Sequence, residues 1–94
     1  MIKANRYFEG QVQSLAFCQQ DQELSIGVML PGAYTFGTAA PERMTVVKGA
    51  LTVKLAPDAE WVTYRDGESF NVAGDASFDL QVEQPTAYLC EYLN

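Results

Sequence analysis

Glu42 and Arg43 are the two side chains in this sequence best suited to chemistry, and they are neighbours in the chain. A guanidinium binds phosphate in bidentate fashion, whereas a buried carboxylate needs donors such as sugar hydroxyls. Successive side chains of an extended segment point to opposite faces, so these two do not share one side of a sheet. The sequence contains no histidine, which excludes a histidine-bound metal. Cys18 and Cys90 form no CxxC motif, so a structural zinc site is not expected.

The segments that must position these residues have the pattern of β-strands. Apolar and polar residues alternate, and no helical period runs for more than one turn. Glycine or proline stands at nearly every boundary, and Gly49 suits the positive φ of a hairpin turn. We predict one all-β domain over residues 1–94, with about nine short antiparallel strands in a sandwich or barrel. The strands are expected at residues 11–17, 24–30, 34–38, 42–47, 51–55, 61–64, 69–72, 77–82 and 86–92.

The composition excludes several classes of partner. Twelve acidic and six basic residues give a net charge of −6, and the cations are scattered. Without a basic stripe we expect no binding to nucleic acid. No stretch approaches the roughly 18 apolar residues of a membrane span, and the N-terminus has no apolar leader segment. We therefore expect a cytoplasmic protein with no membrane partner and with reduced thiols.

Two motifs resemble those of the cupin fold, a small jelly-roll β-barrel. The first is Gly32…Thr38…Glu42-x6-Gly49, and the second is Gly67-x4-Val72-Ala73-Gly74 followed by Ser77-x3-Gln81. Where metal-binding cupins carry histidines, this chain has Phe36, Thr38 and Ser77. The resemblance implies a single-domain cupin-like β-barrel of the jelly-roll type that lacks the usual metal site.

Five longer segments carry a closer resemblance, and together they span nearly the whole chain. They are NRYFEG (5–10), GVMLPGAYTFGTAAPERMTV (27–46), GALTVKL (49–55), GESFNVAG (67–74) and PTAYLCEY (85–92). They are similar to the family of small single-domain cupin pyrimidine/purine nucleoside phosphorylases. The resemblance implies a pentosyltransferase of broad specificity, which converts nucleosides and phosphate reversibly into free base and ribose 1-phosphate. Nucleosides and inorganic phosphate would be its substrates, and no cofactor or metal is expected.

Cupin topology implies an inward face on several strands, and that face supplies the candidate site. Phosphorolysis passes through a ribosyl cation-like transition state, which positioning and fixed dipoles can stabilise without a metal. We expect Glu42 and Thr38 to be catalytic, at the sugar or the phosphate. Alternation along the strands places the substrate-binding candidates on this inward face: Tyr34, Phe36, Met44, Ser77, Asp79, Gln81 and Tyr88. Arg43 is a further candidate, as a phosphate ligand, although alternation places it on the opposite face.

Each candidate also has an ordinary structural interpretation. Asp79 and Gln81 suit a base edge, but polar residues of a strand also form the outer face of a sheet. Tyr34, Phe36 and Tyr88 suit stacking on a base, but inward aromatics are usually core residues. The last strand can turn either of two faces inward. We expect the face with Tyr88, Cys90 and Tyr92 to point inward, rather than the face with Ala87, Leu89 and Glu91.

Two other functions are compatible with the sequence. A cupin module without catalysis would bind a sugar or another small ligand, and a purely structural β-domain would need no polar cavity. A homodimer is also expected, because an apolar stripe is larger than a monomer needs. The stripe comprises Leu24, Ile26, Val28 and Leu30, together with Tyr7 and Phe8.

Overall fold

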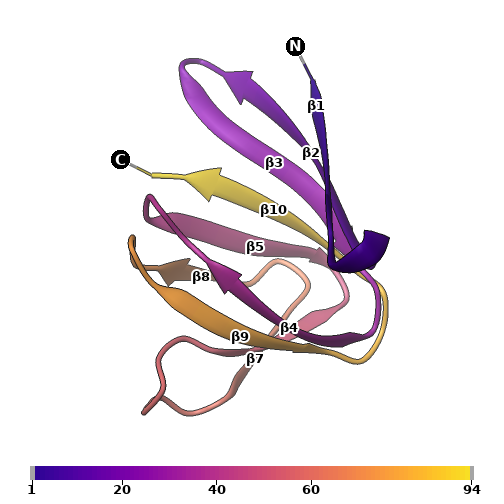
Figure 1. Cartoon of the computed structure of the whole chain (residues 1–94), viewed down its shortest axis with the longest axis vertical. Coiled ribbons are helices and arrows are strands. Elements are labelled where there is room, and N and C mark those ends of the chain that lie inside the picture. The colour runs from indigo at the N-terminus through magenta and orange to yellow at the C-terminus, as the bar shows by residue number, and fades with distance from the viewer. Residues whose placement is uncertain (1, 94) are drawn as a thin grey trace.

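The computed structural model describes residues 2–93 and contains ten strands and one 3₁₀ turn (Figure 1). The elements are β1 (Lys3–Tyr7), η1 (Phe8–Gly10), β2 (Val12–Gln19), β3 (Gln22–Met29), β4 (Gly32–Gly37), β5 (Glu42–Lys48), β6 (Ala50–Lys54), β7 (Val62–Arg65), β8 (Ser69–Val72), β9 (Ser77–Val82) and β10 (Thr86–Tyr92). Within residues 2–93, no helix is long and apolar enough to cross a membrane.

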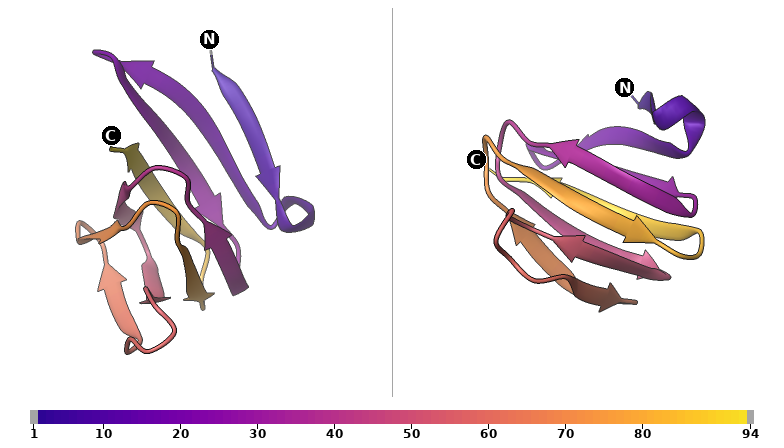
Figure 2. Two further views of the ribbon diagram at one scale, coloured as in Figure 1. Left: turned by 60° about the vertical axis from the view of Figure 1, so that its left-hand side comes forward. Right: turned by 60° about the horizontal axis from the view of Figure 1, so that its bottom comes forward.

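The strands form two antiparallel sheets that face each other. Six strands in the order β1-β2-β3-β10-β5-β8 make one sheet, and four in the order β4-β9-β6-β7 make the other. This jelly-roll arrangement confirms the all-β cupin-like fold. Every strand pair among the described residues lies within one sheet, so the expected barrel is not closed. Figure 2 shows the β1–β2 hairpin reaching past the edge of the four-stranded sheet.

The core lies between the sheets and is built from alternate residues of each strand. On β9 the buried residues are Phe78, Leu80 and Val82, and on β5 they are Met44 and Val46. Fully burying such a side chain stabilises the fold by about 1.5–3 kcal/mol. Because a shift of one residue would expose the whole apolar set, this pattern determines which face of each strand points inward.

The strand β1 was not predicted, and its position explains why. It carries no apolar alternation, and its side chains are exposed or half-buried. As an edge strand it is held by backbone pairing to β2 alone, from Lys3 opposite Ala16 to Tyr7 opposite Val12. A strand that buries neither face has no signature in the apolar pattern.

The predicted outward apolar stripe contains two errors, because Tyr7 lines the cavity between the sheets and Leu24 is buried. Ile26, Val28 and Leu30 are exposed as expected, but Leu24 is only 7% exposed. Its cross-strand partners are Phe17 on β2 and Glu91 on β10. Directly opposite residues share a face of the sheet, so these two side chains cover Leu24 from both sides.

Candidate functional site

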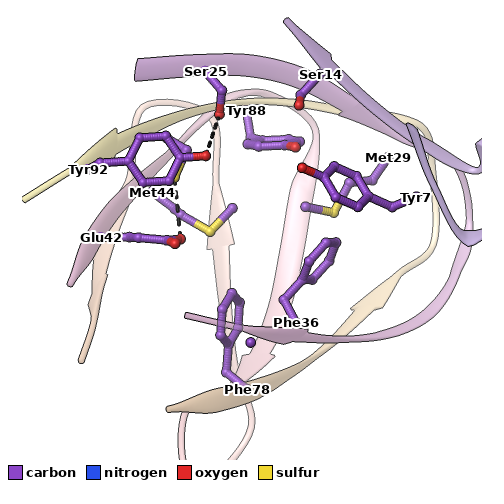
Figure 3. Close-up of a pocket in the computed structure, with 12 residues that line it drawn as sticks. Tyr7, Ser14, Ser25, Met29, Phe36, Glu42, Met44, Phe78, Tyr88 and Tyr92 are labelled. Atoms are coloured by element: carbon purple, nitrogen blue, oxygen red, sulfur yellow. Dashed lines mark hydrogen bonds between the residues drawn. The ribbon is translucent and has the colours of Figure 1, made fainter. Parts of the chain in front are cut away.

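A cavity of about 120 Å³ lies between the two sheets, and it is the candidate site (Figure 3). The larger sheet supplies most of its wall, because β2, β3, β5 and β10 each turn alternate side chains toward it. The smaller sheet supplies the opposite wall from β4 and β9. The lining residues are Tyr7, Ser14, Ser25, Met29, Phe36, Gly37, Glu42, Met44, Phe78, Tyr88, Cys90 and Tyr92.

One end of the cavity is polar and contains its only acid among the described residues, Glu42. The Cys90 thiol donates a hydrogen bond to Glu42 Oε1 over 3.4 Å. Burial raises the pKa of Glu42, because a charged carboxylate is poorly solvated there, and the thiol only partly offsets this. The same burial, with the neighbouring carboxylate, raises the pKa of Cys90 to about 12. The thiol is therefore protonated at neutral pH and acts as a donor rather than a nucleophile.

Two hydroxyls lie beside this acid. Ser25 Oγ and the Tyr92 hydroxyl share a hydrogen bond of 3.2 Å. Ser25 comes from β3 and Tyr92 from β10, so the pairing of these strands holds the two groups together. Burial raises the pKa of Tyr92 to about 12, so the phenol keeps its proton. Carboxylate and hydroxyls together form the kind of polar set that binds sugar hydroxyls.

The far end of the cavity combines aromatic rings with further hydroxyls. Tyr88 and Ser14 are buried there, and burial raises the pKa of the Tyr88 phenol. Figure 3 shows the Tyr7 and Tyr88 hydroxyls on the same side of the cavity, with the rings of Phe36 and Phe78 opposite. The site thus has apolar faces and a small number of fixed polar groups, as ligand sites usually do.

Four of the residues proposed from the sequence come together here. Phe36, Glu42, Met44 and Tyr88 all line the cavity. The preferred inward set of the last strand is also found, since Tyr88 and Cys90 are buried. Tyr34 is buried in the core but does not line the cavity, and its hydroxyl donates to the Leu30 carbonyl over 2.6 Å.

The expected inward orientation of three β9 residues is wrong. Ser77 and Gln81 are exposed, and Asp79 accepts a hydrogen bond of 2.7 Å from Thr35 Oγ1 near the surface. The intervening residues are the apolar ones, Phe78 among them, and they occupy the core. The prediction assumed that Ser77 points inward because it stands at a histidine position of metal-binding cupins. The apolar pattern of this strand requires the opposite orientation, and burial of apolar area decides it.

Thr38 and Arg43 also lie outside the cavity. Thr38 Oγ1 donates to the Ala73 carbonyl over 2.6 Å and accepts from the Ala76 amide over 3.1 Å, so it joins two loops. Arg43 is on the outer face, where its Nε and Nη2 donate to the Glu91 carboxylate over 2.8 and 3.0 Å. This bidentate pair occupies the guanidinium that was proposed for phosphate.

Sequence reasoning did not assign several lining residues to the site. Ser14 has the same parity as the buried Val12 on β2, and a small polar residue on an apolar face was the available signal. Cys90 and Tyr92 belonged to the preferred inward set but received no role. Tyr7 was expected in the outward apolar stripe, but it enters the cavity from β1, the strand that the apolar pattern does not reveal.

The charges in and around the cavity limit what it can bind. All six lysines and arginines of the chain lie within residues 2–93, and none of them lines the cavity. Over the same range, no group of three or more His, Cys, Asp or Glu side chains is placed to hold a metal ion. An anion entering the cavity would therefore be held by hydroxyl and backbone donors.

Fold and cavity together define a small jelly-roll domain of the cupin kind. The profile of the pyrimidine/purine nucleoside phosphorylase family matches residues 2–92, and the chain belongs to this family. A Vibrio cholerae protein named pyrimidine/purine nucleoside phosphorylase is 69% identical over 93 residues, or 99% of this chain and 98% of that protein.

Solved structures agree with the fold. A Vibrio parahaemolyticus protein described as of unknown function is 66% identical, with a TM-score of 0.96 and 99% of both chains covered. A second protein of unknown function, from an Acinetobacter species, is 33% identical with a TM-score of 0.92, covering 99% of this chain and 91% of that one. The family assignment rests on the sequence comparisons, and these structures share the fold.

Proposed function

We propose that this chain catalyses the reversible phosphorolysis of purine and pyrimidine nucleosides without a metal or other cofactor. The observation that carries the proposal is Glu42, a carboxylate with a raised pKa in a cavity that also holds serine and tyrosine hydroxyls. Family membership supports the same chemistry, because the matching profile is named for it. Thr38 and Arg43, which the sequence also suggested, have no part in this proposal.

The reaction transfers a pentosyl group from the base to phosphate. A phosphate oxygen forms a bond to C1′ of the ribose while the C1′–N bond breaks. The departing base takes the electrons of that bond, and the proton that the hydrogen phosphate loses ends on the base. Positive charge develops on the ribose in the transition state. The ionised form of Glu42, which burial disfavours, is stabilised when that charge appears beside it. Its oxygens also accept hydrogen bonds from the ribose hydroxyls.

Phosphate binding must rely on neutral donors, since none of the six lysines and arginines, all within residues 2–93, lines the cavity. The hydroxyl donors that line the cavity belong to Tyr7, Ser14, Ser25, Tyr88 and Tyr92. Hydroxyl donors hold phosphate more weakly than a guanidinium does. We therefore expect a high KM for phosphate. The proposed independence from metals agrees with a chain that contains no histidine.

The test is the release of free base from uridine and from adenosine by the purified protein. Assays with and without phosphate, and with and without a chelator, separate phosphorolysis from hydrolysis and from metal catalysis. Phosphate-dependent release that the chelator does not change supports the proposal. If no base is released but ribose raises the melting temperature, the chain is a sugar-binding module instead.

We also propose that the chain forms a homodimer through the outer face of the larger sheet. Leu15 is 47% exposed, Ile26 43% and Val28 48%. The strand register places Leu15, Ile26 and Leu89 in one row across β2, β3 and β10. An apolar patch of this kind on a small domain is typical of a subunit interface. Light scattering should give twice the 10.4 kDa of the chain, and a mass of one chain would contradict the proposal.

A further inference from the structure

The opening of the cavity is marked by the lining residues that keep contact with solvent. Tyr7 is 41% exposed, and Phe36 is half-buried beside the exposed Gly37. Glu42 and Tyr92, across the cavity from Tyr7 in Figure 3, are half-buried as well. The hydroxyls of the serines and of Tyr88 lie deeper. The opening therefore has an aromatic side and an acidic side.

The aromatic side is extended by the η1 turn. The Phe8 ring lies 4.9 Å from the Tyr34 ring and 5.3 Å from the Phe36 ring, and the Tyr7 ring lies 6.1 Å from that of Phe36. Despite these contacts Phe8 remains 43% exposed. The turn thus leaves aromatic surface uncovered beside the opening. We name Tyr7, Phe8 and Phe36 the aromatic rim.

The backbone of η1 is held in an uncommon conformation to place these rings. Phe8 has a φ of 51° and Glu9 a φ of 57°, both left-handed, and Gly10 follows with a φ of 87°. Side chains other than glycine disfavour this region, and bulky ones disfavour it most. Such strain is retained where the surroundings impose it, and it gathers at ligand-binding elements. A glycine at position 8 would form the same turn more easily but would offer no ring.

The cavity is too small to enclose a whole nucleoside. Its volume of about 120 Å³ is well below the range of about 300–1,000 Å³ for pockets that enclose a whole drug-sized ligand. The polar groups lie inside and suit the ribose and the phosphate. The base must then lie at the opening, where aromatic surface is available and few hydrogen-bonding groups could distinguish one base from another.

We propose that the aromatic rim is the base-binding platform, on which purines and pyrimidines alike stack while the ribose occupies the cavity. This rests on the proposed phosphorylase activity and assigns roles to Tyr7 and Phe8 within it. Stacking on an aromatic ring tolerates any base, because every base has a π-face. Glu42 lines the same cavity and is then the acid beside the ribose of a nucleoside whose base stacks on the rim.

The test uses the reverse reaction, in which the base and ribose 1-phosphate are separate substrates. The variants are Phe8→Leu and Tyr7→Leu, which keep apolar bulk and so preserve folding better than alanine. The matched control is Trp61→Leu, since Trp61 is also 43% exposed but lies outside the cavity. Melting temperatures show whether each variant is folded.

In both rim variants, loss of stacking should raise the KM for uracil and for adenine about tenfold. The KM for ribose 1-phosphate should stay within about twofold, and the control should match the wild type in both. A merely structural role would move both KM values together, and that result would overturn the proposal. So would an unchanged KM for the bases in both variants. A wild-type protein that releases no base would instead refute the phosphorylase activity itself.

Discussion

Cys90 Sγ donates a hydrogen bond to Glu42 Oε1 across the cavity wall, over 3.4 Å between adjacent strands β10 and β5. The pair joins a thiol that keeps its proton to a carboxylate that is reluctant to lose its own, because burial raises the pKa of both groups. Tyr92 is the further titratable group at this end, and it too stays protonated at neutral pH. Glu42 is thus the group at this end whose charge responds to pH below the range in which the thiol and the phenol titrate, with a pKa above its ordinary value.

The first prediction concerns stability and pH. The folded-state pKa of Glu42 lies above the unfolded value, so the folded state binds more protons in between. The associated stability is fully present below the unfolded pKa and is lost as pH rises through the folded pKa. Glu42→Gln, which keeps an acceptor for Cys90, should therefore be more stable than the wild type at pH 8. Urea unfolding at pH 4 and pH 8 measures the free energy of unfolding of both proteins. An equal gain in the variant at both pH values would contradict the prediction.

A second prediction concerns Gly27, which lies beneath the Tyr88 ring on the neighbouring strand. A Cβ at this position would approach the Tyr88 Cζ and hydroxyl oxygen to 2.7 Å and the Gln13 carbonyl to the same distance. Gly27→Ala should displace the ring from the cavity, at a cost of about 1–3 kcal/mol from overpacking.

Chemical denaturation measures the loss of stability in Gly27→Ala. The comparison is Gly37→Ala, where a Cβ would meet only the Ala76 carbonyl at 3.9 Å. The Gly37 variant should lose much less stability. Equal losses in the two variants would show that Tyr88 is not constrained by Gly27.

A third prediction concerns Arg43, whose guanidinium is paired with Glu91 on the outer face. Because it does not reach the cavity, Arg43→Gln should leave the KM for phosphate within about twofold of the wild-type value. Initial rates at varied phosphate concentration provide the measurement. A tenfold increase in the KM for phosphate would contradict this prediction and would indicate that Arg43 binds phosphate.

Much of the fold could be predicted from the sequence, because alternation and turn residues report it directly. The strand at residues 86–92 matches β10 at both ends, and Gly49 has the positive φ expected of it, at 116°. What escaped prediction is β1, whose stability comes from backbone pairing at a sheet edge. Backbone hydrogen bonds are available to any sequence and leave no trace in side-chain pattern.

The candidate site was predicted where local pattern and family resemblance agree. On β5 both place Glu42 and Met44 inward, and the structure has them in the cavity. On β9 they disagree, and the apolar residues rather than Ser77 point inward. The position of Tyr7 in the cavity depends on how the β1–β2 hairpin packs against β4, and no local sequence pattern predicts that packing.

The central claim is that Glu42 acts at the sugar during phosphorolysis, and its most direct test is a comparison of two glutamate variants. The kcat/KM for phosphate-dependent release of uracil from uridine is measured for the wild type, for Glu42→Gln and for Glu83→Gln, an exposed acid outside the cavity. We predict a decrease of at least about tenfold in Glu42→Gln, since the amide carries no charge for the transition state, and none in Glu83→Gln. An unchanged rate in a folded Glu42→Gln protein would contradict the account.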